Sequence, residues 1–438
     1  MTVSPPVDWL ARPVLELVPS GPVSGSLESP SSKSLTNRLL VIAALAEGTS
    51  VLDEVLASDD TMAMTSGLQA LGARIRRVGD HTEVTGTAGR PSAGEGDGRG
   101  ARVGAGLSGT TLRFLAAVAL LARGTVVLDG DEPLRRRPIG PFLDALRAAG
   151  ADVSTDHGRP PLRVTSRGFA GGRLRVDASA SSQFATGILL VGPYADSDLV
   201  LEVDGLRELG YVRLTVQVMA RWGASVVEEE PGRFRVGAHL PYLAREETVE
   251  HDASAAAHLF ALGVATGGSV TVANAFDTAQ PDGRMAELLA AMGAVVTRGP
   301  GGTTVERTGE LTGIDVDLGG MPDQVPTVAV LGALARGDTV IHGVEIARGH
   351  ETDRIRAVAT ELRRLGARVE EEAGGLVVHG GAPLHAARVE TYRDHRLAMA
   401  FSALGAVVPG VEVIDPGCVA KTYPRFWADL VRLGVGLR

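Results

Sequence analysis

Lysine and cysteine are the two residue types that this 438-residue sequence nearly lacks. Of the 43 lysines and arginines, only Lys33 and Lys421 are lysines, and Cys418 is the single thiol. One cysteine excludes an intrachain disulfide and favours a reducing compartment, so we expect a cytoplasmic protein. Because arginine fills nearly every other cationic position, the two lysines indicate places that need a compact, flexible ammonium group. The alternative is that both survive by chance on a solvated surface.

Other absences narrow the class of protein. Aromatic residues make up 4% of the chain and the formal net charge is −9. Both values argue against base stacking and against broad binding to nucleic acids or membrane surfaces. No apolar run reaches membrane-spanning length, and residues 1–22 contain no basic segment before an apolar one, so we expect no secretory signal. The apolar content of 44% is typical of a globular protein with room for two or three domains.

Motifs for several common mechanisms are missing. The sequence has no Gly-x-x-x-x-Gly-Lys-Ser/Thr loop for nucleotide phosphates and no Gly-x-Ser-x-Gly elbow for acyl-serine chemistry. His350, Glu351 and His395 do not have the spacing of metal ligands. We expect no Gly-x-Gly-x-x-Gly after a strand, so a nicotinamide cofactor is not supported, and we expect neither a metal nor a cofactor.

A repeated pattern of glycines indicates the fold. Six glycines lie about 70 residues apart, each after an amphipathic helical stretch: Gly72, Gly150, Gly223, Gly293, Gly366 and Gly434. Alternating, strand-like residues follow the first five, as at 74–78 and 368–370. Because glycine commonly ends a helix, each unit is interpreted as helix, glycine cap and strand. A period of this length predicts a repeated supersecondary unit.

A second repeated feature lies about half a period from these glycines. Nearly all-apolar stretches begin in clusters of polar, small residues, at 31–34, 108–111, 179–183, 252–254, 323–327 and 393–396. A helix that is apolar all round is buried, so we expect six buried helices whose polar first turns face a cleft. Such N-termini together would attract anions through backbone N–H groups and helix dipoles. The alternative is that these serines, threonines and aspartates are ordinary helix caps.

Three repeats in each half predict two similar domains. We expect the first domain at 32–250 and the second at 1–31 plus 251–438, which a strand at 14–18 would join. The glycine-rich stretches 93–106 and 299–302 are expected to be surface loops between the repeats.

Seven cations fall in or beside the polar motifs: Lys33, Arg38, Arg113, Arg137, Arg354, Arg396 and Lys421. In a chain of net negative charge, such local concentration suits small ligands with several anionic groups. Glu351 is the candidate for acid–base catalysis, as a carboxylate whose protonation nearby arginines tune. A surface ion-pair cluster is the alternative. We predict a two-domain enzyme that closes around phosphate- and carboxylate-bearing substrates.

These motifs together resemble the family of 5-enolpyruvylshikimate-3-phosphate synthases. The resemblance covers nearly the whole chain and follows the family's order, in SSKSLTNR (31–38), SGTTLR (108–113), RPI (137–139), SSQF (181–184), HETDR (350–354), DHRLAM (394–399) and AKT (420–422). It implies a mixed α/β (α+β) fold of two similar domains. Each domain would hold three βαβαββ repeats around buried parallel helices, an inside-out α/β barrel.

The resemblance also implies a reaction and its substrates. The enolpyruvyl group of phosphoenolpyruvate would move to the 5-hydroxyl of shikimate 3-phosphate, releasing phosphate by addition and elimination, in aromatic amino acid biosynthesis. The partners would be these two small molecules, without nucleic acid or membrane, and we expect a monomer. The implied shikimate 3-phosphate ligands are Lys33, Ser34, Arg38, Ser181, Ser182, Gln183, Asp323 and His350. The implied phosphoenolpyruvate ligands are Lys33, Gly109, Arg137, Gln183, Arg354, Arg396 and Lys421.

Three residues are implied to be catalytic. Asp323 would help to take the 5-hydroxyl proton, Glu351 would deliver and remove protons at the methylene carbon, and Lys33 would touch both substrates. A protonation of carbon needs a nearby acid, and the leaving phosphate needs neutralised charge, so these residue types fit the chemistry.

The sequence departs from the family's pattern at four positions, and two alternatives stay open. Leu107 and Ile346 stand where asparagines are usual, Glu208 where a phosphate-binding serine is usual, and His350 replaces a lysine. One alternative is the sister enzyme UDP-N-acetylglucosamine enolpyruvyl transferase, which has the same fold and donor. The other is a non-catalytic relative that only binds anions.

Overall fold

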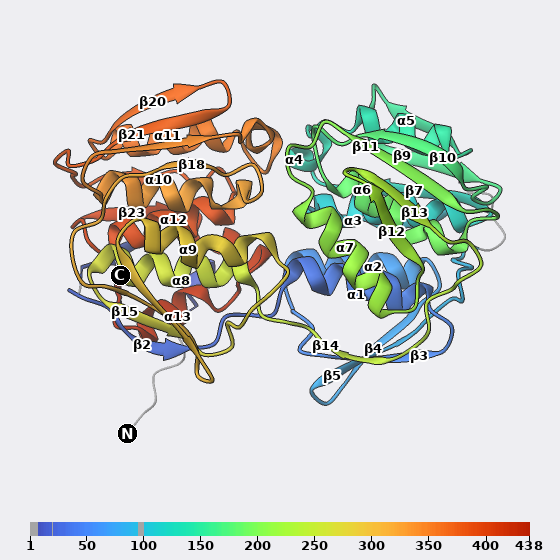
Figure 1. The fold of residues 1–438 in the computed structure, drawn as a ribbon, viewed down its shortest axis with the longest axis horizontal. Helices are drawn as coiled ribbons and strands as arrows, with labels where there is room; N and C mark the ends of the chain where they lie inside the picture. The colour runs from blue at the N-terminus through green and yellow to red at the C-terminus, as the bar shows by residue number, and fades with distance from the viewer. Residues whose placement is uncertain (1–7, 20, 95–99) are drawn as a thin grey trace. The chain divides into compact units, whose positions relative to one another are not determined.

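The structure is a computed structural model that describes residues 8–19, 21–94 and 100–438. The chain forms two compact units (Figure 1). The inserted unit consists of 31–250, and the terminal unit consists of 1–30 together with 251–438. The two chain crossings are adjacent. The Ser32 N–H donates to the Glu250 carbonyl at 2.8 Å within the inserted unit, and the Asp252 N–H donates to the Pro30 carbonyl at 2.7 Å within the terminal unit.

The inserted unit contains three four-stranded sheets of the same topology. Their strand orders are β14 (Glu246–Thr248), β3 (Thr49–Asp53), β5 (His81–Thr85), β4 (Arg74–Val78); β6 (Ala101–Gly104), β7 (Gly124–Asp129), β9 (Arg159–Ser166), β8 (Asp152–Asp156); and β10 (Gly172–Asp177), β11 (Leu199–Asp204), β13 (Arg233–Val236), β12 (Val226–Glu230). The first two strands of each sheet are parallel and the other neighbours are antiparallel. The sheets surround three buried helices, α1 (Lys33–Leu45), α3 (Gly109–Val118) and α6 (Gln183–Val191). Half-buried helices accompany them: α2 (Asp59–Ala70), α5 (Gly140–Ala148) and α7 (Gly210–Arg221), with the short α4 (Glu132–Arg135).

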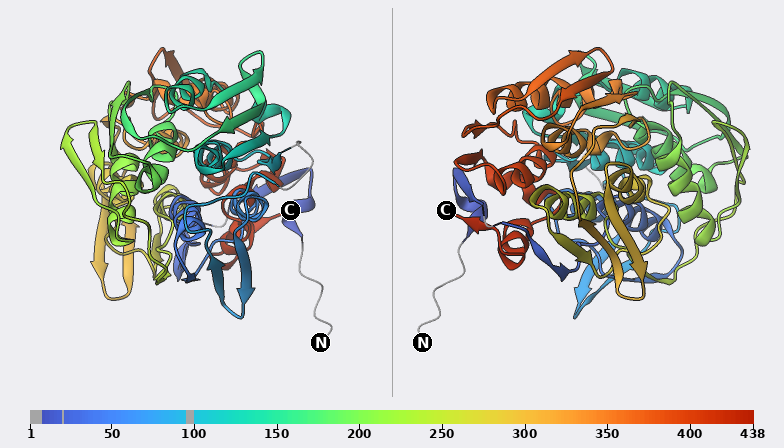
Figure 2. Two further views of the ribbon diagram at one scale, coloured as in Figure 1. Left: turned by 90° about the vertical axis from the view of Figure 1, so that its right-hand side faces the viewer. Right: turned by 60° about the vertical axis from the view of Figure 1, so that its left-hand side comes forward.

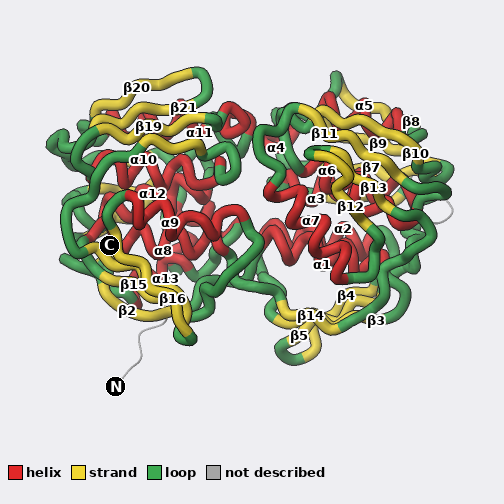
Figure 3. Tube along the Cα trace, in the orientation of Figure 1, coloured by secondary structure: helices red, strands yellow, loops and turns green. Residues whose placement is uncertain are grey.

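The terminal unit repeats this plan. Its sheets are β2 (Ser24–Leu27), β15 (Ser269–Val272), β17 (Gly302–Arg307), β16 (Ala294–Gly299); β18 (Asp315–Asp317), β19 (Asp338–His342), β21 (Gly375–His379), β20 (Arg368–Glu372); and β22 (Arg388–Val389), β23 (Val411–Ile414), β1 (Val14–Val18), β24 (Gly436–Leu437). The buried helices are α8 (Ala253–Thr266), α10 (Val325–Leu334) and α12 (His395–Gly405), and the outer ones are α9 (Met285–Ala291), α11 (Arg354–Arg364) and α13 (Phe426–Arg432). Figure 3 shows the helices inside the strands in both units. The predicted fold class, with βαβαββ repeats around buried helices, is confirmed.

The six repeated glycines end the six outer helices. Each has a φ between 90° and 103° and lies between helices α2, α5, α7, α9, α11 or α13 and the strand that follows. L-residues with a Cβ rarely adopt this backbone conformation, so glycine is needed where the chain leaves each helix. The sixth glycine, Gly434, also precedes a strand, the two-residue β24.

The polar residues at the buried helix starts are partly ordinary caps. The side chains of Ser32, Ser108, Asp252 and Asp394 accept hydrogen bonds from N–H groups in the first turns of α1, α3, α8 and α12. The starts of α6 and α10, at Ser182 and Gln324, have no such side-chain cap. Capping therefore explains four of these residues, as the alternative proposed, but not the cations beside them.

Segments distant in sequence complete one sheet in each unit. β1 lies between β23 and β24, with Leu15 opposite Val413, and Figure 2 shows this N-terminal strand beside the C-terminal segment. β14 pairs with β3 in the inserted unit.

The glycine-rich stretch 93–106 is not only a loop, because β6 occupies 101–104; part of the stretch, 95–99, lies outside the described residues. Its small residues Ala101 and Val103 are buried in the sheet. Residues 299–302 form the turn between β16 and β17. Among the described residues, no helix is both long and apolar enough to cross a membrane.

Candidate active site

Arg354 is the centre of a buried charge cluster in the terminal unit. It is the first residue of α11, and only 1% of its side chain is exposed. Its Nε and Nη2 donate to the two carboxylate oxygens of Asp394 at 2.7 and 3.2 Å, in a bidentate pair. Its Nη1 donates to Asp323 Oδ1 at 2.5 Å and lies 2.9 Å from His350 Nδ1. Burial alone would lower the pKa of Arg354, but Asp394, Asp323 and Glu351 raise it well above its usual value.

Glu351 lies between two cations of this cluster. Its Oε2 accepts from Arg354 Nη2 at 2.9 Å, and its Oε1 is 3.5 Å from Lys421 Nζ. Lys421 ends a 3₁₀-helix (Pro416–Lys421) and is 5% exposed, while Glu351 is 15% exposed. Lys421 is therefore not a solvated surface lysine kept by chance, because it contacts the predicted catalytic carboxylate.

Asp323 contacts two arginines of the cluster, Arg354 and Arg396. It lies in the 3₁₀ turn before α10, and its second oxygen accepts from Arg396 Nη2 at 2.9 Å. Burial would raise the pKa of Asp323, but Arg396, Arg354 and His350 hold it well below its usual range. The ionised carboxylate thus occupies donors of both arginines. The terminal unit brings together every predicted site residue it contains: Asp323, His350, Glu351, Arg354, Arg396 and Lys421.

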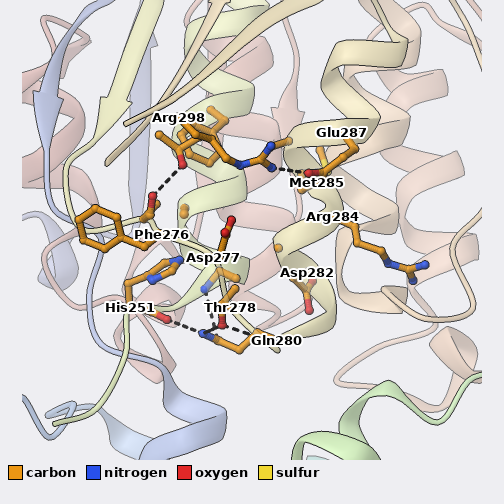
Figure 4. A pocket seen from close by; sticks show the side chains of 17 residues that line it. His251, Phe276, Asp277, Thr278, Gln280, Asp282, Arg284, Met285, Glu287 and Arg298 are labelled. Atoms are coloured by element: carbon orange, nitrogen blue, oxygen red, sulfur yellow. Dashed lines mark hydrogen bonds and ion pairs between the residues drawn. The ribbon is translucent and has the colours of Figure 1, made fainter. Parts of the chain in front are cut away.

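A second layer of polar side chains lies behind Asp323. The neighbouring Gln324 donates through Nε2 to Asp282 Oδ1 at 2.7 Å, and both side chains are buried. Asp282 also lines a pocket of about 250 Å³ beside the start of α8 (Figure 4). There the amide of Gln280 donates to the His251 carbonyl at 2.6 Å. The hydrogen bond from Gln324 to Asp282 therefore ties the residue after Asp323 to the 3₁₀-helix Pro281–Arg284.

His258 is a buried histidine under the same cluster. It lies on α8 with 1% exposure, and its Nδ1 is 3.1 Å from Thr327 Oγ1 on α10. Burial lowers the pKa of His258 well below its usual value, and Arg396 and Arg354 lower it further against the opposing effect of Asp323. The imidazole is therefore neutral in the folded protein at neutral pH.

The neutral state of His258 predicts a pH dependence of stability. Because its folded pKa is depressed, its contribution is present above the unfolded value near 6.5 and is lost as pH falls below it. Between pH 6 and 5, we expect the free energy of unfolding to fall by about 1 kcal/mol more in the unaltered protein than in His258→Asn. Urea unfolding at both pH values measures this difference. Equal slopes for the two proteins would contradict it.

The inserted unit carries the other half of the predicted residues. Lys33 is the first residue of α1, and its Nζ lies 3.4 Å from Oδ2 of the buried Asp60 on α2. One turn later, Arg38 is 3% exposed; its Nη1 donates to the Ser34 carbonyl at 2.8 Å and its Nε to Thr215 Oγ1 at 2.8 Å. Burial lowers the pKa of Arg38 to about 10, which still leaves it charged at neutral pH.

Gln183 connects α6 to α3. Its Oε1 accepts from Arg113 Nη1 at 2.8 Å, and its Nε2 donates to Thr110 Oγ1 at 3.0 Å. Its backbone N–H donates to Ser181 Oγ at 3.2 Å, so the Ser181-Ser182-Gln183 turn is held against the start of α3.

Gly109 gives room for two arginines at the start of α3. A Cβ added there would lie 2.9 Å from Arg137 Nη1 and 3.0 Å from Arg113 Nη1. Arg137 therefore sits on the Gly109 backbone, whereas its neighbours Arg135 and Arg136 form surface ion pairs with Asp129 and Glu132. Three consecutive arginines are often part of a solvated loop, and this description fits Arg135 and Arg136 but not Arg137, whose side chain lies against Gly109.

The expectation that no Gly-x-Gly-x-x-Gly follows a strand is wrong. Gly104, Gly106 and Gly109 form Gly-x-Gly-x-x-Gly between β6 and α3, a spacing typical of dinucleotide sites. Here β6 belongs to a mixed four-stranded sheet with two antiparallel pairings, not to a doubly wound parallel sheet. The motif therefore lacks the fold context that a nicotinamide site requires.

Two of the four departures from the family pattern are visible in the contacts. Glu208 is exposed before α7, and its carboxylate is a minor cause, after the Glu228 hydrogen bond, of the raised pKa of Arg213. His350 contacts Arg354 and lies 3.6 Å from Asp323, so it shares in the cluster in place of the usual lysine.

Comparisons with known proteins identify the family. Residues 17–430 match the family described as EPSP synthase (3-phosphoshikimate 1-carboxyvinyltransferase). The chain belongs to the EPSP synthase family. A 3-phosphoshikimate 1-carboxyvinyltransferase from Methanoculleus marisnigri is 40% identical over 96% of this chain and 100% of its own. The one from Nostoc punctiforme is 40% identical over 94% and 97%.

Solved structures show the same fold. EPSP synthase from Acinetobacter baumannii is similar with a TM-score of 0.80 at 24% identity, over 97% of this chain and 99% of that one. The enolpyruvyl transferase NikO from Streptomyces tendae is similar with a TM-score of 0.75 at 20% identity, over 97% and 98%.

Several partners of the predicted residues were not assigned from the sequence. Asp394 was part of a recognised motif, yet its bidentate pair with Arg354 comes only with the fold. Asp60, 3% exposed beside Lys33, follows Asp59 in a polar helix start, which was its only local signal. Both are buried carboxylates, and loss of one partner of such a buried ion pair would leave the neighbouring cation without compensation.

The contact of Lys33 with Asp60 predicts that arginine cannot replace it. A Lys33→Arg variant keeps the charge but places a longer, planar group at the start of α1. We expect kcat/KM to fall about 100-fold, because small displacements of a binding group have effects of this size. Steady-state kinetics and a thermal unfolding midpoint should be measured together. Normal kinetics would show that any cation suffices there.

Proposed function

We propose that this member of the EPSP synthase family transfers the enolpyruvyl group of phosphoenolpyruvate to the 5-hydroxyl of shikimate 3-phosphate. The C5 oxygen forms a bond to C2 of phosphoenolpyruvate while the methylene carbon gains a proton. In the tetrahedral adduct, the methyl group formed in the first step then gives up a proton, and the bond between C2 and the phosphate oxygen breaks. The products are the enolpyruvyl ether and inorganic phosphate, and no group of the protein is covalently changed.

Two catalytic roles are supported by the terminal unit's geometry. Glu351 carries the proton to and from the methylene carbon, since Arg354 and Lys421 hold one oxygen each. Asp323 accepts the 5-hydroxyl proton. Its ionised state suits an acceptor, and anionic substrates that take over donors of Arg354 and Arg396 would raise its basicity.

Binding roles are shared by the two units. The residues that would hold phosphoenolpyruvate are Lys33, Gly109, Arg137, Gln183, Arg354, Arg396 and Lys421. Those that would hold shikimate 3-phosphate are Lys33, Ser34, Arg38, Ser181, Ser182, Gln183, Asp323 and His350. Arg38 supports this assignment, because three hydrogen bonds fix its guanidinium, one to the Ser34 carbonyl in the first turn of α1 and two to Thr215 and Tyr211 on α7. A fixed cation at a helix N-terminus favours a phosphate group.

The observation that carries the proposal is the carboxylate of Glu351 between Arg354 and Lys421. An anion-binding site alone needs no carboxylate among its cations, because the carboxylate would repel the ligand. A reaction that protonates carbon beside an anionic substrate needs one. We also propose, as the expected state, a monomer in the cytoplasm.

Phosphate release tests the function directly. The protein is mixed with phosphoenolpyruvate and shikimate 3-phosphate, and inorganic phosphate is followed against mixtures that lack either substrate. We expect release only when both are present. Release with UDP-N-acetylglucosamine instead would indicate the sister activity. Saturable binding of both substrates without release would indicate an anion-binding relative.

A further inference from the structure

A strained turn delivers two residues to the cluster around Arg354. Tyr392 and Arg393 are consecutive non-glycine residues with φ of 54° and 59°, directly before Asp394. L-residues with side chains are disfavoured in this left-handed region, and two in succession are unusual. Strain of this kind persists only where surrounding contacts hold it. The contacts that hold this turn therefore control where Asp394 and Arg396 lie.

One buried carboxylate provides those contacts. Glu361 is fully buried on α11. Its Oε1 accepts from the Tyr392 hydroxyl at 2.8 Å, and its Oε2 accepts from the Glu390 backbone N–H at 3.1 Å. Burial and this hydrogen bond to Glu361 raise the pKa of Tyr392 to about 12, so the phenol keeps its proton. Glu361 is thus tied to the first residue of the strained pair and to the backbone two residues before it.

Glu361 and Arg354 share one helix. They lie seven residues apart on α11, which is about two turns. Arg354 holds Asp394 by a bidentate pair, while Glu361 holds Tyr392, so α11 contacts the segment on both sides of Arg393. The segment then enters α12, where Arg396 donates to Asp323 at 2.9 Å.

We propose that Glu361 is a positioning residue that, through Tyr392, keeps Tyr392 and Arg393 in their left-handed conformation and so aims Asp394 and Arg396 at the active site. It touches no substrate and acts through these residues. The inference rests on the proposed function for its kinetic readout, since Arg354 and Arg396 are there assigned to phosphoenolpyruvate.

A simple ion pair does not explain Glu361. Its Oε2 also accepts from Arg364 Nη1 at 2.8 Å, but the Arg364 side chain is 45% exposed. Exposed pairs of this kind contribute little, and one would not require a carboxylate with no exposure at all. The bonds to the Tyr392 hydroxyl and the Glu390 backbone account for the burial, because both lie in the segment that leads to Asp394.

Tyr392→Phe is the decisive variant, because it removes only the hydroxyl from a residue that is 36% exposed. We expect KM for phosphoenolpyruvate to rise about tenfold, in proportion to one lost charge-assisted hydrogen bond, with KM for shikimate 3-phosphate unchanged within about twofold. Glu361→Gln should shift the same constant in the same direction. Adding Arg393→Asn to Tyr392→Phe should restore most of the affinity, because asparagine tolerates the left-handed region.

Tyr194→Phe is the matched control. It removes a hydroxyl that donates to the Leu45 carbonyl at 2.6 Å in the inserted unit. A purely structural role of Tyr392 would make the two variants alike: a lower melting temperature with no selective change in KM for phosphoenolpyruvate. That result would overturn the proposal.

Amide hydrogen exchange gives a readout that does not depend on turnover. In Tyr392→Phe, exchange at Asp394 and Leu397 should be about tenfold faster than in the unaltered protein, since their N–H groups bond within the 391–397 segment. Unchanged exchange would overturn the positioning role. If the unaltered protein shows no turnover, the proposed function fails, and the exchange result still decides for or against Glu361.

Discussion

A Glu351→Gln variant is expected to turn over about 1000-fold more slowly than the unaltered protein, with KM for both substrates within about threefold. Glutamine keeps the shape of the side chain, and its carbonyl oxygen can still accept from Arg354 or Lys421, the two groups that contact Glu351. It cannot exchange a proton with the methylene carbon. Loss of one negative charge also removes repulsion toward an anionic ligand, so weaker binding is not expected.

Steady-state phosphate release and direct binding measurements should be compared for this variant. Glu345→Gln is the control, because Glu345 is exposed in the neighbouring 3₁₀-helix (Glu345–Gly349), and its replacement should leave the rate unchanged. A Glu351→Gln protein with near-normal turnover would remove Glu351 from the mechanism. Weakened binding at an unchanged rate would assign it to substrate affinity instead.

An Arg354→Lys variant should lose both activity and stability. The guanidinium makes a planar set of contacts to Asp394, Asp323, Glu351 and His350 that a single ammonium group cannot reproduce. Asp394 has no solvent exposure and would lose its bidentate partner. We expect the free energy of unfolding to fall by about 3 kcal/mol and kcat/KM to fall at least about 1000-fold.

Arg348→Lys provides the comparison. Arg348 also contacts two carboxylates, Asp353 at 2.9 Å and Glu371 at 3.0 Å, but its side chain is 27% exposed. Its replacement should lower the free energy of unfolding by at most about 1 kcal/mol. Urea unfolding and steady-state kinetics of both variants show whether the losses depend on the burial of the arginine or only on its contacts with charged carboxylates. Similar losses for the two would show that the buried cluster has no special role.

Much of the fold could be predicted because its determinants are local. The glycine after each outer helix reflects a backbone conformation at one residue, and all six have it. The apolar composition of helices such as α10, which has no charged residue, likewise indicates burial directly. The strand β6 could not be predicted, since Ala101 and Val103 carry a weak strand signal in a glycine-rich stretch and are stabilised by pairing with β7.

In the candidate site, too, some features could be predicted from the sequence and others could not. The cations beside the helix starts were visible in the sequence because lysine is so rare and the motifs so short. Their partners were not, since Asp60, for example, comes from another helix and meets Lys33 only in the folded unit. The assignment of individual residues to each substrate stays a prediction.

The adjacent chain crossings have a consequence for biosynthesis. β1 is synthesised before the inserted unit, yet Leu15 can pair with Val413 only after that unit has also been made. In an unstructured chain that contact would close a very long loop at considerable entropic cost. Once 31–250 has folded, the bond from Ser32 to Glu250 holds the two ends of that segment together. The earlier folding of the inserted unit thereby brings β1 near the strands that are synthesised after that unit.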